Sequence, residues 1–81
     1  MELVDTVSLM TSSSYEDRFK AEYYQTKIRI EKLESIIEKY KDNKLDFEPK
    51  CTLELLAKQY KSMVDYLFIL EHRARVEEIK L

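Results

Sequence analysis

Apolar side chains recur at alternating steps of four and three residues through two long stretches of the chain. Because such steps keep side chains on one face of an α-helix, both stretches predict long amphipathic helices that pack along a partner, as in a coiled coil. Thr26 is the one member that is not apolar. The first stripe comprises Phe19, Tyr23, Thr26, Ile30, Leu33, Ile37 and Tyr40, and the second comprises Leu53, Leu56, Tyr60, Met63, Leu67, Leu70 and Ala74.

Capping residues mark the ends of both helices. Ser13 and Ser14 can each begin the first helix, because an acid three residues later completes a capping box. Asn43 tolerates the left-handed conformation that ends helices, and Thr52 is a good N-cap for the second helix. The predicted elements are a helix over about 15–41, a connector over 42–52 and a helix over about 53–79.

The two stripes fit each other when the helices run antiparallel. Tyr40 then faces Leu53, Tyr23 faces Leu70, and every apolar residue of one stripe meets an apolar residue of the other. Sequences that fold reliably show this agreement between the spacing of apolar residues within each helix and the packing of the helices against each other. The predicted fold class is therefore all-α, a long antiparallel two-helix hairpin over residues 15–81.

Two segments lie outside these helices. Leu45 and Phe47 in the connector are expected to fold back and plug the closed end of the hairpin. Residues 1–14 form an N-terminal arm, in which apolar positions spaced for a short helix precede the polar run Thr11-Ser12-Ser13-Ser14. A short docked helix and a disordered or domain-swapped arm are both compatible with that pattern.

One hairpin leaves apolar side chains without a partner. From Met63 to Leu70 the second helix is apolar nearly all round, which is typical of a helix with neighbours on several sides. A small domain is marginally stable alone, and the single cysteine allows no internal disulfide. The N-terminal arm would cover part of the patch, but we expect self-association into a helical-bundle homo-oligomer, most simply a dimeric four-helix bundle. The expected interface residues are Val64, Tyr66, Phe68, Ile69 and Val76.

Composition narrows the class of protein. Charged residues make up 37% of the chain, with no glycine and one proline, which suits long helices. The formal net charge of −2 argues against general nucleic-acid binding. No apolar run approaches the roughly 20 residues that span a membrane, and no signal-peptide pattern is visible. These features predict a soluble, cytosolic protein.

The chain carries no motif that predicts catalysis. It has no Gly-rich phosphate loop and no recognisable nucleophile elbow. One histidine and one cysteine are too few for a closed zinc site. Cys51 is expected to be a packed connector residue, because His72 lies too far along the second helix to serve it as a base. We therefore expect a protein that is not an enzyme and needs no metal or cofactor.

The antiparallel pairing does suggest one ligand site, where the first helix begins and the second ends. Arginines grip phosphates through paired N–H donors and stack on rings, and a helix N-terminus adds free N–H groups. The alternative is a set of exposed i,i+4 salt bridges, Arg18–Glu22 and Glu71–Arg75. The candidate ligand-binding residues are Tyr15, Arg18, Tyr23, Arg73 and Arg75.

Three groups of residues form a distinctive pattern over about residues 10–81. They are Tyr15-x-x-Arg18-x-x-x-Glu22-Tyr23, then Leu45-Asp46-Phe47-x-Pro49-x-Cys51, then Leu55-Leu56 with Gln59, Met63, Tyr66, Leu70, Arg73-Ala74 and Glu77. This pattern resembles a family of small phage and prophage proteins related to an uncharacterised crAss-like phage protein. The chain departs from that family at Thr52, where members often have proline.

The resemblance implies a phage or prophage accessory protein that acts in the host cytoplasm. The anti-CBASS sponge family is similar in size and architecture, although no motif matches. The leading hypothesis is a counter-defence protein that sequesters a cyclic or linear nucleotide signal. The alternatives are a module that occludes a host or phage protein through Tyr66, Ile69 and Val76, and a structural phage component.

Overall fold

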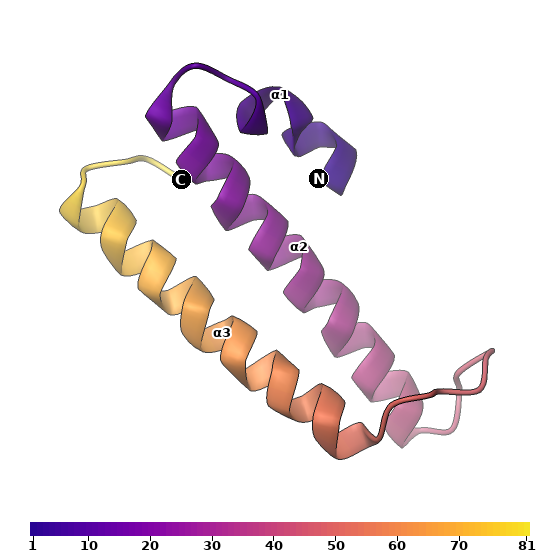
Figure 1. Cartoon of the computed structure of the whole chain (residues 1–81). Coiled ribbons are helices and arrows are strands. Elements are labelled where there is room, and N and C mark those ends of the chain that lie inside the picture. Colours follow the sequence, from indigo (N-terminus) through magenta and orange to yellow (C-terminus); the bar gives the residue numbers. More distant parts are fainter.

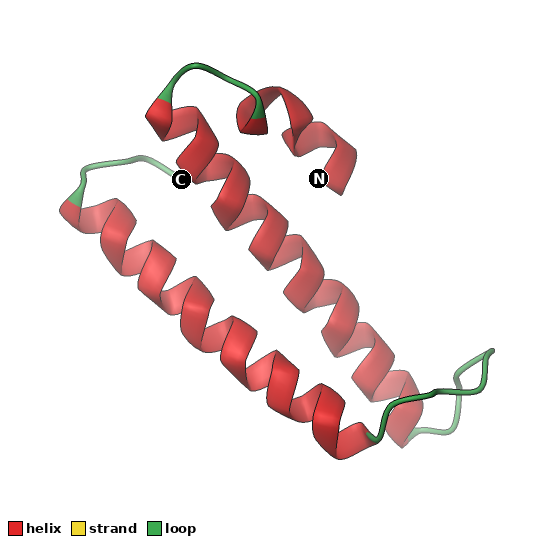
Figure 2. Cartoon of the chain, viewed as in Figure 1, coloured by secondary structure: helices red, strands yellow, loops and turns green.

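The computed structural model describes residues 1–81 and contains helices but no strand, which confirms the all-helical class (Figure 2). Helices α2 (Tyr15–Lys41) and α3 (Leu53–Val76) lie side by side and run antiparallel, with residues 42–52 joining them (Figure 1). The chain is elongated, with extents of 43 × 24 × 16 Å. None of the helices has the length and the apolar character that crossing a membrane requires.

Both long helices begin at hydroxyl caps. The Ser14 side chain accepts a hydrogen bond from the Asp17 N–H at 3.4 Å, so Ser14 and not Ser13 begins α2. The Thr52 hydroxyl accepts from the Leu55 N–H at 3.1 Å and begins α3. Each cap satisfies one backbone donor that the first helical turn leaves free.

Both long helices end in the same left-handed turn, although the chain contains no glycine. Asn43 has φ 55° after α2, and Glu78 has φ 58° after α3. After α3, the Ile79 N–H donates to the Ala74 carbonyl at 2.8 Å and the Glu78 N–H donates to the Arg75 carbonyl at 3.3 Å, which is a Schellman motif. The helix therefore stops at Val76, before the predicted end near residue 79.

After α3 the C-terminal tail turns back over the end of the helix pair where α2 begins and α3 ends. We call this the open end, because the connector closes the other one. Ile79 is 7% exposed and belongs to the main core cluster. A hydrophobic contact across the turn commonly accompanies a Schellman motif, and here Ile79 and Ala74 supply it. The tail thus completes the core instead of extending α3.

Replacing Glu78 with glycine is expected to stabilise the protein by about 1 kcal/mol, because a side chain with a Cβ is disfavoured in the left-handed region. Thermal unfolding followed by circular dichroism measures the change. Glu78→Ala is the matched control, since it removes the carboxylate but keeps the Cβ, and it should not produce the gain. Equal effects of the two variants would contradict this explanation.

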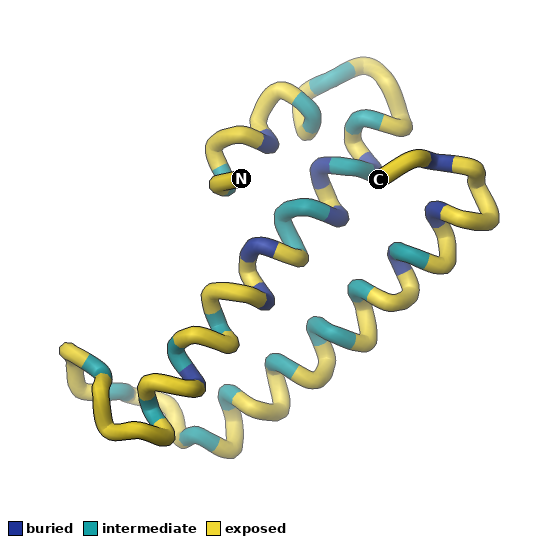
Figure 3. The backbone as a smooth tube through the Cα atoms, turned by 180° about the vertical axis from the view of Figure 1, so that it is seen from behind, coloured by how far each residue is buried: buried dark blue, intermediate teal, exposed yellow.

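The core is concentrated at the open end of the helix pair. Every member of the two predicted stripes is buried or half-buried. No residue of α3 before Leu70 is buried, however, so the half of α3 nearest the connector is covered on one side only (Figure 3). The largest buried cluster comprises Phe19, Tyr23, Leu70, Ala74 and Ile79.

The N-terminal arm is docked on α2 as a 3₁₀ turn, η1 (Leu3–Thr6), followed by the short helix α1 (Val7–Met10). Thr6 is fully buried, and its hydroxyl accepts a hydrogen bond from the Gln25 side-chain amide at 2.9 Å. Ile28 of α2 is buried as well. The arm therefore covers α2 and leaves the apolar face of α3 open.

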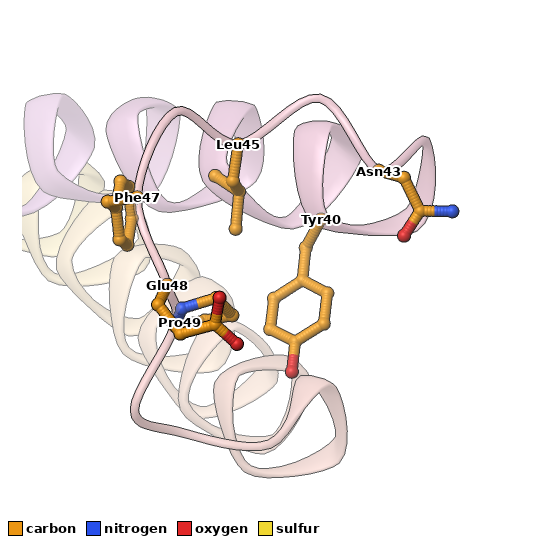
Figure 4. Close-up of a pocket in the computed structure, with 6 residues that line it drawn as sticks. All are labelled: Tyr40, Asn43, Leu45, Phe47, Glu48 and Pro49. Carbon is orange, nitrogen blue, oxygen red and sulfur yellow. The ribbon is translucent and has the colours of Figure 1, made fainter.

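The connector does not plug the closed end as expected. Phe47 is 54% exposed, and Leu45 is half-buried. Figure 4 shows the Leu45 side chain between those of Phe47 and Tyr40, and the three line a pocket of about 340 Å³ with Asn43, Glu48 and Pro49. The prediction that Phe47 fills the end of the hairpin is therefore wrong, because the connector bulges outward before it returns to α3.

Candidate functional site

Tyr15, Arg73 and Glu77 form a cluster at the open end, which we call the open-end cluster. The Tyr15 hydroxyl donates to the Glu77 carboxylate at 2.5 Å and accepts a hydrogen bond from Arg73 Nη2 at 3.1 Å. Arg73 Nε also donates to the other Glu77 oxygen at 3.2 Å. Two of these contacts, both made by Tyr15, join the start of α2 to the end of α3, and the third lies within the end of α3.

The phenyl ring of Phe19 lies beneath this cluster. The Arg73 guanidinium carbon is 5.1 Å from the ring centroid, which is within the range of a cation–π contact. Phe19 is itself buried in the core. The guanidinium is therefore held by a rigid aromatic base and a carboxylate, while about half of the Arg73 side chain, 47%, remains exposed.

The cluster shifts the protonation equilibria of its three members. The hydrogen bond to Glu77 raises the pKa of the Tyr15 hydroxyl above its ordinary value. The hydrogen bond from Tyr15 lowers the pKa of Glu77, and the contact with Glu77 raises the pKa of Arg73. At neutral pH the cluster thus contains a neutral phenol, a carboxylate and a guanidinium.

The Arg73 guanidinium keeps hydrogen-bonding capacity for a ligand. Its Nε and Nη2 atoms bond Glu77 and Tyr15, but Nη1 makes no hydrogen bond within the chain. A planar guanidinium can present two parallel donors to a phosphate or carboxylate. Glu77 fixes the orientation of the guanidinium, so the remaining edge points in a defined direction.

Arg18 lies near this cluster but has a different neighbour. Its Nη1 donates to the Ser12 carbonyl at 2.9 Å, and the Ser12 hydroxyl donates to Asp17 at 2.8 Å. Arg18 is one helical turn from Tyr15, so both residues project on the same side of α2. The Arg18–Glu22 and Glu71–Arg75 salt bridges considered from the sequence are absent; Arg73–Glu77 forms instead.

The other two candidate ligand residues lie elsewhere. Tyr23 is 8% exposed and belongs to the main core cluster, where its ring meets Tyr24 edge-on at 5.2 Å. Arg75 is exposed, and residues two apart on a helix do not face each other, so it projects away from Arg73. The structure brings together Tyr15 and Arg73, with Arg18 nearby.

Glu77 and Phe19 belong to this site, although the sequence pattern predicted no role for them there. The i,i+4 spacing of Arg73 and Glu77 was a signal for the ion pair. Phe19 was counted as a core residue only, because its contact with Arg73 depends on how the two helices are aligned. Helical periodicity predicts that Phe19 is buried, but it cannot show that the Phe19 ring also contacts the Arg73 guanidinium.

The expected interface residues differ in exposure. Phe68 is 63% exposed, Ile69 58%, Val76 72% and Tyr66 40%, whereas Val64 is half-buried. Four of these large apolar side chains therefore lie at the surface of a single helix, and contiguous apolar patches usually mark interaction sites. The side of α3 that is free to bind a partner is the one on which most of these exposed side chains lie.

The fold and the open-end cluster define a small all-helical protein with an exposed arginine–aromatic site, and no group of histidine, cysteine, aspartate or glutamate side chains is arranged to hold a metal ion. The chain belongs to the Sequestin family, whose model matches residues 13–76. No curated protein and no solved structure matched the chain significantly. The matched range includes both long helices and omits η1 and α1.

Proposed function

We propose that this protein sequesters a small nucleotide-type signal by binding it without catalysis, as a homo-oligomer. In the setting that the sequence resemblance implies, sequestration would protect a phage or prophage from a host defence signal. The observation that carries the proposal is the Arg73 guanidinium, held over an aromatic ring with one edge free. The family name, Sequestin, agrees with a sequestering role.

The proposed contacts use three side chains of the open end. The free edge of Arg73 binds one phosphate, and Arg18 supplies a second guanidinium one helical turn from Tyr15. The Tyr15 ring, which is 50% exposed, offers a surface on which a base can stack. Glu77 acts as a positioning residue, because its carboxylate holds the Nε edge of Arg73 and leaves the opposite edge for the ligand.

Binding without turnover is tested by equilibrium dialysis against cyclic and linear nucleotides, followed by denaturation and chromatography of what the protein retained. We expect one class of nucleotide to be retained and released chemically unchanged, because the open-end cluster offers donors and a ring but no activated nucleophile. Conversion of the nucleotide would contradict a sequestering role, and so would retention that is equal for every nucleotide and lost at moderate salt.

A second candidate function rests on the exposed apolar face of α3. A host or phage protein could dock a helix there and be occluded. Tyr66, Ile69 and Val76, with exposures of 40–72%, favour such a surface. A protein that stays monomeric and captures a defined partner helix would support this candidate, whereas a stable homo-oligomer with the face buried would exclude it.

A further inference from the structure

A second stripe with alternating steps of four and three residues runs the length of α3, turned away from the one that packs on α2. All its members are exposed. Steps of four and three sustained over this length form the seam by which one helix packs along another. The second stripe comprises Leu55, Gln59, Ser62, Tyr66, Ile69, Arg73 and Val76.

The accessible surface of the chain exceeds that of a compact monomer of the same mass by about the share that one partner contributes to an interface. The accessible surface is 6162 Å². A compact monomer of 9.8 kDa is expected to have about 5,200 Å². The excess, roughly 1,000 Å², is close to the ~800 Å² that each partner contributes to a stable interface of standard size.

We propose that a second copy of this chain packs along the second stripe, with the two α3 helices antiparallel and Tyr66 at the two-fold axis. In that register the positions of the stripe are self-complementary, as an interface with two-fold symmetry requires. Leu55 meets Val76 of the partner subunit, and Gln59 meets Arg73 of the partner subunit. A parallel arrangement would instead set Arg73 against Arg73 of the partner subunit, and like charges in contact repel.

Arg73 links this surface to the open-end cluster, because it belongs to both. The antiparallel register brings Gln59 of the partner subunit beside each Arg73 guanidinium. The partner would therefore contribute an amide to the edge of the cluster and exclude water from one side. This last step rests on the proposed ligand site, whereas the interface itself follows from the stripe and the surface area.

The proposal separates the expected interface residues into two groups. Tyr66, Ile69 and Val76 belong to the second stripe. Phe68 and Val64 lie on another side of α3, because each is only one or two residues from the nearest member of the stripe, and such neighbours do not share a helix face. Phe68 is therefore predicted to stay exposed in the dimer. Ile69 and Phe68 are neighbours of similar exposure, 58% and 63%, and form a matched pair for an experiment.

Sedimentation equilibrium of Ile69→Glu, Phe68→Glu and the unaltered protein tests the interface over a series of concentrations. We expect a dimer for the unaltered protein and for Phe68→Glu, and a monomer with unchanged helical circular dichroism for Ile69→Glu. A monomeric unaltered protein, a dimeric Ile69→Glu variant, or dissociation by Phe68→Glu would each overturn the proposal.

Disulfide trapping tests the register, in a background where Cys51 is replaced by serine. Tyr66→Cys is expected to cross-link to its own copy on mild oxidation, because both Tyr66 positions lie at the two-fold axis. Leu55→Cys is expected not to, because in the antiparallel register it faces Val76 of the partner subunit. A Leu55→Cys homodimer would contradict the antiparallel register. Neither experiment requires a ligand, so its failure is distinguishable from a failure of nucleotide binding.

Discussion

Replacing Arg73 with alanine is expected to raise the Kd of a retained nucleotide about 100-fold, which corresponds to roughly 3 kcal/mol. Hydrogen bonds from a charged donor contribute about 1.5–3 kcal/mol each, and a guanidinium edge supplies up to two to one phosphate. Arg73 is half-exposed and outside the core, so helical content should not change. Isothermal titration calorimetry with the nucleotide retained in dialysis gives the measurement.

Two further variants make this result specific. Arg75→Ala removes the same charge two residues away on another side of α3, and we expect it to change the Kd only slightly. Arg73→Lys keeps the charge but loses the planar pair of donors, so its affinity should fall between those of Arg73→Ala and the unaltered protein. Equal losses in Arg73→Ala and Arg75→Ala would mean that general charge, and not the open-end cluster, holds the ligand.

Replacing Leu70 with alanine is expected to remove most of the stability of the chain. Leu70 is fully buried, at 0% exposure, in the cluster that joins α2, α3 and the C-terminal tail. A buried Leu→Ala change of this kind costs about 3–5 kcal/mol. A chain of this length has a total free energy of unfolding of about 4–12 kcal/mol. The melting temperature should therefore fall by roughly 15–30 °C or the protein should not fold.

Phe68→Ala is the control for the Leu70 variant. It removes a larger apolar side chain, but that side chain is 63% exposed, so the stability should change by less than about 1 kcal/mol. Thermal unfolding at matched protein concentration compares the two variants. Similar melting temperatures for both would contradict the position of the core at the open end.

Periodicity was enough to predict the pairing faces of the two long helices, because each position was set by its own neighbours at three and four residues. The C-terminal tail could not be predicted in this way. Glu78 adopts a left-handed conformation without the glycine that usually marks it, and Ile79 continues the apolar spacing of a helix. The turn is favoured because it places Ile79 over the buried cluster at the open end, and this contact between distant parts of the chain is not visible in the local sequence.

The candidate site was predictable only in part. The antiparallel pairing correctly indicated that Tyr15 and Arg73 lie near each other, since this follows from the register alone. It could not separate Tyr23, which the core absorbs, from Tyr15, which remains exposed. The sequence does not show how far the neighbouring helix covers these aromatic side chains. The extent of that cover depends on where the chain turns after α3.

The most direct test of the sequestration proposal is native mass spectrometry of the purified protein after incubation with an equimolar mixture of cyclic and linear nucleotides. It reports subunit number and bound ligand in one spectrum. We expect a dimer that carries one class of nucleotide, releases it unchanged on denaturation, and loses it in the Arg73→Ala variant. A protein that carries no nucleotide, whatever its subunit number, would contradict the proposed function.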